Sequence, residues 1–159
     1  MIKAVEISDI PECAAVIRSS FRTVADEFGF TPANAHMFTA FAVNEDRLYH
    51  QLNAEKRPMY KYTEKGRIAG YYSLVIKDEE CELNNLCVLP EVRHHGIGRA
   101  LLEDSFGRAT DAGCSVMKLG IVEENSMLKR WYEGFGFKHT GCEKYDLFPF
   151  TCGYMEREL

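Results

Sequence analysis

The stretch from Leu86 to Leu102 carries residue types that suit the binding of a phosphate group. It contains an apolar, strand-like run, a turn with two glycines and basic flanks, and the start of an amphipathic helix. The first turn of a helix presents unpaired backbone N–H groups and the positive end of the helix dipole. Gly96 and Gly98 carry no side chain that would keep a phosphate from those amides, and Arg93 and Arg99 add positive charge. The pattern predicts an anion site on the backbone between the two arginines.

The spacing disfavours two common nucleotide-binding loops. A P-loop has Lys followed by Ser or Thr after its second glycine, whereas Gly98 is followed by Arg99 and Ala100. A dinucleotide-binding fingerprint has a third small residue where Leu101 stands, and an acidic residue about 20 positions further on that this chain lacks.

A second motif lies further along the chain. Asn125 precedes Tyr132 by seven residues, and residues 131–137 read Trp-Tyr-Glu-Gly-Phe-Gly-Phe. This run, together with Val-x-Pro and Arg-x-x-Gly-x-Gly in the first stretch, resembles the GCN5-related N-acetyltransferases, the GNAT family. The resemblance is strong over residues 67–140 and covers residues 1–60 only in outline.

The resemblance implies an acetyl-CoA-dependent N-acetyltransferase. In such an enzyme the strand before the loop holds the pantetheine arm and the thioester carbonyl through backbone groups, here those of Leu86, Cys87 and Val88. The pyrophosphate lies on the loop amides, here those of Arg93, His94, His95, Gly96, Ile97, Gly98 and Arg99. A non-catalytic coenzyme A-binding module is the alternative, and Tyr132 favours the enzyme over it.

Tyr132 matches the tyrosine that protonates the coenzyme A thiolate in many relatives. A phenol with a pKa of about 10 keeps its proton at neutral pH, so it can act as that acid. Aromatic packing at the end of a short helix is the alternative role. Asn125 either binds the cofactor arm or caps the helix, and the sequence favours neither.

The resemblance implies a general base early in the strand before the loop, where many relatives carry a carboxylate. Glu82 stands at the matching offset from Val88 and is the predicted base. Alternating side chains would place it on one face with Asn84, Leu86 and Val88. A water molecule is an alternative base, and Glu82 could instead extend the acidic run at residues 78–80. Cys87 is interpreted as a packing residue, and adjacent His94 and His95 predict no metal site because no third ligand is evident.

Strands that alternate with helices, with a hairpin at each end, predict an α/β fold around a mixed sheet. The resemblance to the GNAT family implies that this central sheet is mostly antiparallel, with about six to seven strands and about four flanking helices. The chain is expected to form a single domain, residues 1–159. A helix should begin near Asp9 and Pro11, and Thr31-Pro32 should open a second helix. Strands are predicted at 2–7, 58–63, 67–76, 82–88, 116–122, 137–145 and 150–158, with further helices at 96–112 and 125–134.

Composition and charge limit the classes of binding partner and the cellular compartment that we expect. The chain has a net charge of −5 and a pI near 5.6, which argues against nucleic acid and anionic membrane surfaces. None of its six cysteines forms a Cys-x-x-Cys pair, and no signal peptide is visible, so a cytoplasmic protein with reduced thiols is expected. The acceptor amine, on a small molecule or a peptide, stays open, as does a homodimer. The resemblance implies that the acceptor pocket lies between the segment 28–32 and the last hairpin. Aromatic residues of that hairpin could line the pocket, with core packing as an equal alternative for each of them, namely Tyr145, Phe148, Phe150 and Tyr154.

Overall fold

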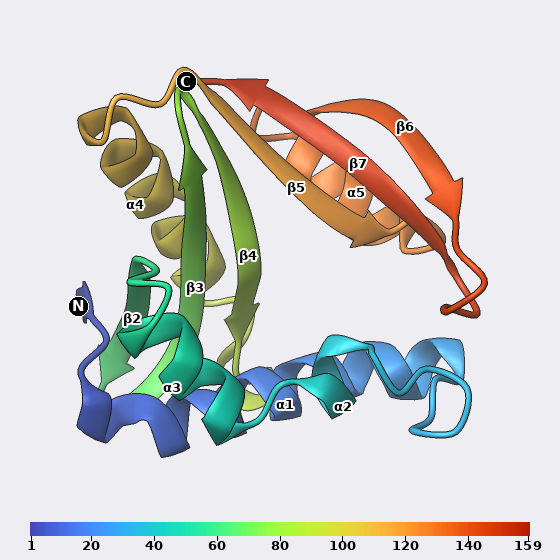
Figure 1. Ribbon diagram of the computed structural model, residues 1–159, viewed down its shortest axis with the longest axis horizontal. Coiled ribbons are helices and arrows are strands. Elements are labelled where there is room, and N and C mark those ends of the chain that lie inside the picture. Colours follow the sequence, from blue (N-terminus) through green and yellow to red (C-terminus); the bar gives the residue numbers. More distant parts are fainter.

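Seven strands form one continuous sheet in the computed structural model, which describes residues 1–159. The strand order is β1-β2-β3-β4-β5-β7-β6, and all neighbouring strands are antiparallel except β4 and β5 (Figure 1). This confirms the predicted mixed, mostly antiparallel sheet. The strands are β1 (Ile2–Ala4), β2 (Met59–Glu64), β3 (Arg67–Lys77), β4 (Glu80–Val88), β5 (Val116–Val122), β6 (Lys138–Lys144) and β7 (Thr151–Glu158).

Five α-helices cover the sheet. Apolar side chains of α1 and α3 pack on one face with β3, while α4 and α5 pack on the opposite face with β3, β4 and β5. The structure contains no helix long and apolar enough to cross a membrane. The helices are α1 (Ile10–Phe28), α2 (Thr39–Ala42), α3 (Glu45–Asn53), α4 (Ile97–Asp111) and α5 (Ser126–Glu133).

The expected helix at Thr31-Pro32 is absent, so that prediction was wrong. The Thr31 N–H donates to the Asn34 side chain at 2.7 Å, and the Asn34 N–H donates back to the Thr31 hydroxyl at 3.2 Å. These are the two reciprocal bonds of a capping box, and the Ala35 N–H donates to the Thr31 carbonyl at 2.8 Å, but helical pairing stops after this single turn. A turn therefore follows the left-handed Gly29 at the end of α1, and the next helix begins at Thr39.

The parallel strands β4 and β5 are paired over only a short length. Glu80 to Glu82 align with Val116 to Lys118, and beyond this point the strands diverge (Figure 1). The remainder of each strand therefore has an unpaired edge that faces the other across a wedge. The aromatic pocket described below occupies the wedge.

A bulge interrupts β4 inside this wedge. Tyr71 pairs with Cys87, and Ser73 pairs with Asn84, so β4 has one residue more than β3 between these pairs. Asn85 absorbs the extra residue with a positive φ of 55°. A bulge of this kind shifts the alternation of side chains by one position.

The bulge corrects the predicted arrangement of side chains along β4. Leu83 before the bulge and Leu86 after it both contact the core cluster under α4, whereas Cys87 packs on the α1 side. Simple alternation predicted that Leu86 and Val88 share a face with Glu82. The structure shows that they lie on the opposite face, so that prediction was wrong.

Candidate active site

The loop before α4 has a run of unpaired backbone donors. The Arg93 N–H bonds the Pro90 carbonyl, and the next amide with an acceptor is Ala100, which donates to the Gly96 carbonyl at 3.0 Å. The N–H groups from His94 to Arg99 therefore donate to no group of the protein. Successive free amides at a helix N-terminus make an anion-binding concavity.

Gly96 and Gly98 serve this loop in different ways. Gly96 caps α4 with a φ of 84°, a left-handed conformation that other residues adopt at a cost. Gly98 has no such constraint, and a Cβ there would make only ordinary contacts, 3.7 Å from the Trp131 ring and from Val88. Packing does not require glycine at position 98, so its effect is to leave the amides accessible.

The two arginines that flank the loop have different environments. The half-buried Arg93 guanidinium donates to the Val88 carbonyl at 3.1 Å, to the Thr23 hydroxyl at 3.0 Å and to both the carbonyl and hydroxyl of Ser20 at 3.0 Å. Its side chain therefore ties the loop to α1, whereas the sequence suggested that it adds charge at the phosphate. Arg99 is exposed and pairs only with Glu103, at 2.8 Å.

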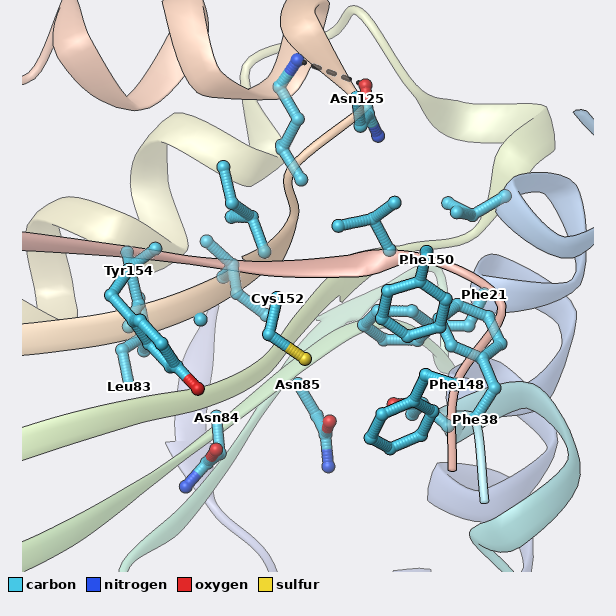
Figure 2. Close-up of a pocket in the computed structure, with 18 of the residues that line it drawn as sticks. Phe21, Phe38, Leu83, Asn84, Asn85, Asn125, Phe148, Phe150, Cys152 and Tyr154 are labelled. Atoms are coloured by element: carbon cyan, nitrogen blue, oxygen red, sulfur yellow. Dashed lines mark hydrogen bonds between the residues drawn. The ribbon is translucent and has the colours of Figure 1, made fainter. Parts of the chain in front are cut away.

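Two pockets meet beside this loop. The loop pocket, about 430 Å³, is lined by α1, the end of β4, the segment 93–99 and α5. The aromatic pocket, about 280 Å³, occupies the wedge between β4 and β5 and extends to α1, the segment 37–39 and the hairpin β6–β7 (Figure 2). Both are lined by Phe21, Val24, Leu86, Asn125, Leu128 and Tyr132, so they join at these residues.

Tyr132 lies at this junction. Its ring is buried and packs edge-on against Phe137 and Trp131, with centroids 5.4 and 5.0 Å away. Its hydroxyl makes no hydrogen bond within the protein, and burial raises the pKa of the phenol above its usual value. The ring thus fills the packing role, and the hydroxyl keeps a proton that it can donate into the junction.

Asn125 combines the two roles that the sequence left open. Its side-chain oxygen accepts the Leu128 N–H at 3.2 Å and caps α5 (Figure 2). The side-chain nitrogen has no partner in the protein, and the residue lines both pockets. It can therefore cap the helix and still donate to a ligand.

The remaining predicted site residues are spread around the pockets. Glu82 is exposed, has no ion-pair partner and lines the aromatic pocket. Leu86, Cys87 and Val88 line the loop pocket, and burial raises the pKa of the Cys87 thiol to about 12, so the thiol is protonated. Ile97 is buried beneath the loop, His94 and His95 are exposed, and no group of three His, Cys, Asp or Glu side chains is placed to hold a metal ion.

The aromatic pocket only partly matches the predicted acceptor walls. Phe148, Phe150 and Tyr154 line it, as expected for the last hairpin. The segment 28–32 does not line it, although the Phe30 ring supports Phe150 from behind at 4.8 Å. No sequence pattern identified the polar residues of the bulge or the second apolar wall as lining of this pocket. These residues are Asn84, Asn85, Phe21, Met37 and Phe38.

Comparison with known proteins defines the class. A family model described as the acetyltransferase (GNAT) domain matches residues 27–147. Two relatives are each 28% identical to this chain. One is an uncharacterised N-acetyltransferase of Lactobacillus delbrueckii subsp. lactis (147 residues, 85% of this chain and 83% of the relative). The other is the ribosomal protein bS18 alanine N-acetyltransferase of Escherichia coli K12 (123 residues, 75% of this chain and 77% of the relative).

Solved structures share the fold. The ribosomal-protein-S18-alanine N-acetyltransferase of Escherichia coli superposes with a TM-score of 0.78 at 19% identity, covering 99% of this chain and 92% of that one. The PaiA N-acetyltransferase of Thermoplasma acidophilum, solved with coenzyme A, gives 0.76 at 18% identity, covering 100% and 98%.

The chain therefore belongs to the GNAT acetyltransferase family. This confirms the enzyme class predicted from the two motifs, that of an acetyl-CoA-dependent N-acetyltransferase.

Proposed function

We propose that the protein transfers an acetyl group from acetyl-CoA to a primary amine of a small molecule or peptide, with the loop pocket holding the donor and the aromatic pocket the acceptor. The observation that carries this assignment is the run of free amides from His94 to Arg99 at one side of a joined pair of pockets. The phenol of Tyr132 lies where the two pockets meet.

The residues of the loop fit the pyrophosphate of coenzyme A. Free amides and a helix N-terminus favour an anion, and the exposed Arg99 adds positive charge at the same place. The Asn125 side-chain nitrogen and the unpaired edge of β4 at Leu86 face the junction and offer hydrogen bonds to the pantetheine arm. When bound, acetyl-CoA supplies the acetyl group as a thioester.

Tyr132 then acts as the general acid and Glu82 as the general base. The Tyr132 hydroxyl holds its proton where the departing sulfur would lie. Glu82 is the only acidic residue that lines the aromatic pocket, and it takes the proton of the acceptor amine directly or through water. The Cys87 thiol is buried and protonated, so the acetyl group is assigned a direct transfer without an enzyme thioester.

The cofactor assignment is tested at Gly98. Gly98→Val places a branched side chain among the free amides without the strain expected at Gly96. We expect the Kd for acetyl-CoA to rise at least tenfold in a folded variant, measured by calorimetry. Gly107→Val, in the middle of the same helix with open space around it, is the matched control. Equal affinity in both variants would contradict the assignment.

The enzyme is separated from a non-catalytic coenzyme A-binding module by turnover. Sustained release of coenzyme A thiol with a panel of primary amines supports the enzyme. Tight acetyl-CoA binding with no thiol release from any amine supports the module.

We also propose a cytoplasmic location. The support for the location is the chemistry of the six cysteines, none of which is in a disulfide and four of which are buried. No role in binding nucleic acid or membrane is proposed.

A further inference from the structure

The aromatic pocket has two unlike sides. Phenyl rings of Phe21, Phe38, Phe148 and Phe150 form one side, and Phe150 lies 4.9 Å from Phe148 and 5.7 Å from Phe38 (Figure 2). Fifteen of the 21 residues that line the pocket are hydrophobic. This side can enclose an apolar group about the size of a leucine or phenylalanine side chain.

The other side is polar but carries no basic group. Figure 2 shows Asn84, Asn85 and Tyr154 on this side, opposite the phenyl rings. Glu82 is the only charged residue that lines the pocket. Lys144 lies on the hairpin nearby, but its ammonium group donates to the carbonyls of Tyr145 and Phe148 and does not line the pocket.

A chain of hydroxyl groups fixes what Tyr154 offers to a ligand. The Tyr145 hydroxyl donates to the Glu143 carboxylate at 2.9 Å and lies 2.8 Å from the Tyr154 hydroxyl. Each phenol has one proton, so Tyr154 must donate its own proton to Tyr145. The Tyr154 oxygen is left with lone pairs alone, which accept hydrogen bonds from N–H groups and repel a carboxylate.

We propose that the acceptor is a primary amine that carries a large apolar side chain and an adjacent amide rather than a free carboxylate. An N-terminal leucine, methionine or phenylalanine residue of a peptide has this chemistry, as does a small amino-acid amide. The apolar group lies among the phenyl rings, the amide meets Asn84 and Asn85, and Tyr154 accepts from a donor N–H. This inference rests on the proposed function and names the substrate class for the same site.

The free carboxylate is the discriminating group. Moving an anion into a pocket that holds no cation and one carboxylate is unfavourable, because its lost hydration is not replaced by a partner. An amide of the same size has no charge to compensate and can pair with either asparagine. Free amino acids should therefore be poor acceptors, even with a suitable side chain.

The test measures kcat/KM with saturating acetyl-CoA for phenylalaninamide, alaninamide, phenylalanine and the tripeptide amide Phe-Ala-Ala. We expect phenylalaninamide to exceed both alaninamide and phenylalanine by tenfold or more. The tripeptide separates the two sources of this chemistry: a higher value than phenylalaninamide indicates a peptide acceptor, and a lower value indicates a small amide. Equal or better use of alaninamide or of phenylalanine overturns the proposal.

Variants of the pocket sharpen the result. Phe148→Ala should reduce the ratio of phenylalaninamide to alaninamide at least threefold, while Phe106→Ala on α4, outside both pockets, should leave the ratio unchanged. Met37 is 45% exposed and lines the pocket, so Met37→Arg can supply the absent cation without disturbing the core. The Met37→Arg variant should raise kcat/KM for phenylalanine relative to that for phenylalaninamide. An unchanged ratio would contradict the claim that the missing cation excludes free carboxylates.

Failure of the inference can be told apart from failure of the proposed function. Turnover with the opposite preference contradicts the substrate class and leaves the acetyltransferase assignment intact. No thiol release with any of these amines, or with a wider panel, contradicts both.

Discussion

The loop pocket and the aromatic pocket recognise ligands by different means. The loop pocket offers backbone amides from one continuous segment, His94 to Arg99. Two glycines leave these amides accessible, and Arg99 is the side chain that adds charge. The aromatic pocket is built from side chains of α1, the segment 37–39, β4, β5, α5 with its cap Asn125, and the β6–β7 hairpin with its turn. A site made of backbone tolerates many sequences around a short motif, whereas a site made of side chains changes with each substitution. One fold can thus keep its donor and change its acceptor.

Tyr132 belongs to both pockets, and its loss should have the largest effect. Tyr132→Phe removes one hydroxyl and leaves the packed ring, so we expect kcat to fall by about 10²-fold while acetyl-CoA still binds. Because burial raises the pKa of this phenol, its deprotonation should not limit activity below about pH 10. The measurement is steady-state thiol release from pH 6 to 10.

The control for this variant is Tyr49→Phe on α3, which is partly buried and lies outside both pockets. A higher KM for acetyl-CoA with an unchanged kcat in Tyr132→Phe would mean that the hydroxyl only holds the donor. No change in either constant would mean that Tyr132 is a packing residue and that water supplies the proton.

The two loop arginines test whether the loop pocket depends on its anchor to α1. Arg93→Ala removes four hydrogen bonds of a half-buried guanidinium and leaves Ser20 and Thr23 without those donors. We expect the free energy of unfolding to fall by about 2 kcal/mol in urea titrations.

Arg99→Ala is the matched comparison. Its side chain is 70% exposed, so stability should change by less than about 0.5 kcal/mol, while the Kd for acetyl-CoA should rise a few-fold. The opposite outcome is an Arg93→Ala variant that keeps its stability and binds acetyl-CoA tenfold more weakly. It would mean that Arg93 binds the phosphate, as the sequence suggested.

The sequence predicted the elements around the loop pocket well because local rules determine them. The strand at 116–122 has the predicted bounds, and α4 begins one residue after the predicted start at Gly96. The direction of the Arg93 side chain could not be predicted, because its acceptors on Ser20 and Thr23 lie about 70 positions away on α1. Spacing within a motif cannot report such a contact.

The aromatic pocket was harder to predict for the same reason. The bulge at Asn85 reverses the alternation along β4, and asparagine, which tolerates a positive φ, gives only a weak local signal for it. Phe21 enters the pocket from α1, and Phe38 enters it from the segment after the turn at Thr31, where the sequence predicted a helix. The aromatic residues of the last hairpin could be named, but their pocket-lining role could not be separated from packing.

Glu82 tests the acid–base chemistry on the acceptor side. Glu82→Gln should lower kcat by about tenfold near pH 7, a modest loss because water can reach this exposed position. The loss should shrink as the pH rises towards the pKa of the acceptor amine, since more of the amine is then already neutral. Glu79→Gln in the same acidic run is the control. Full kcat in Glu82→Gln across the pH range would assign the base to water or to another carboxylate.

Substitution of Glu123 is expected to have the smallest effect on activity. It tests which of the two pockets this residue supports. Glu123 follows β5 and binds Lys129 on α5 through one oxygen and His139 on β6, at 2.9 Å, through the other. Burial raises its pKa, but the bonds to Lys129 and His139 outweigh it and hold the pKa below its usual value. A carboxylate of this kind contributes stability above its unfolded pKa of about 4.3 and loses it as the pH falls through the folded value.

Glu123→Gln should therefore lower the free energy of unfolding by about 1 kcal/mol at pH 7, and the gap to the natural protein should close as the pH falls below about 4. The carboxylate also lies over Gly153 of β7, where a Cβ would come within 2.0 Å of it. Loss of the Glu123 ion pairs should therefore affect the hairpin that carries Phe148 and Tyr154 more than the loop before α4. We expect the KM of the acceptor to rise up to threefold with an unchanged Kd for acetyl-CoA. A change confined to acetyl-CoA would mean that Glu123 supports α5 and the loop pocket instead.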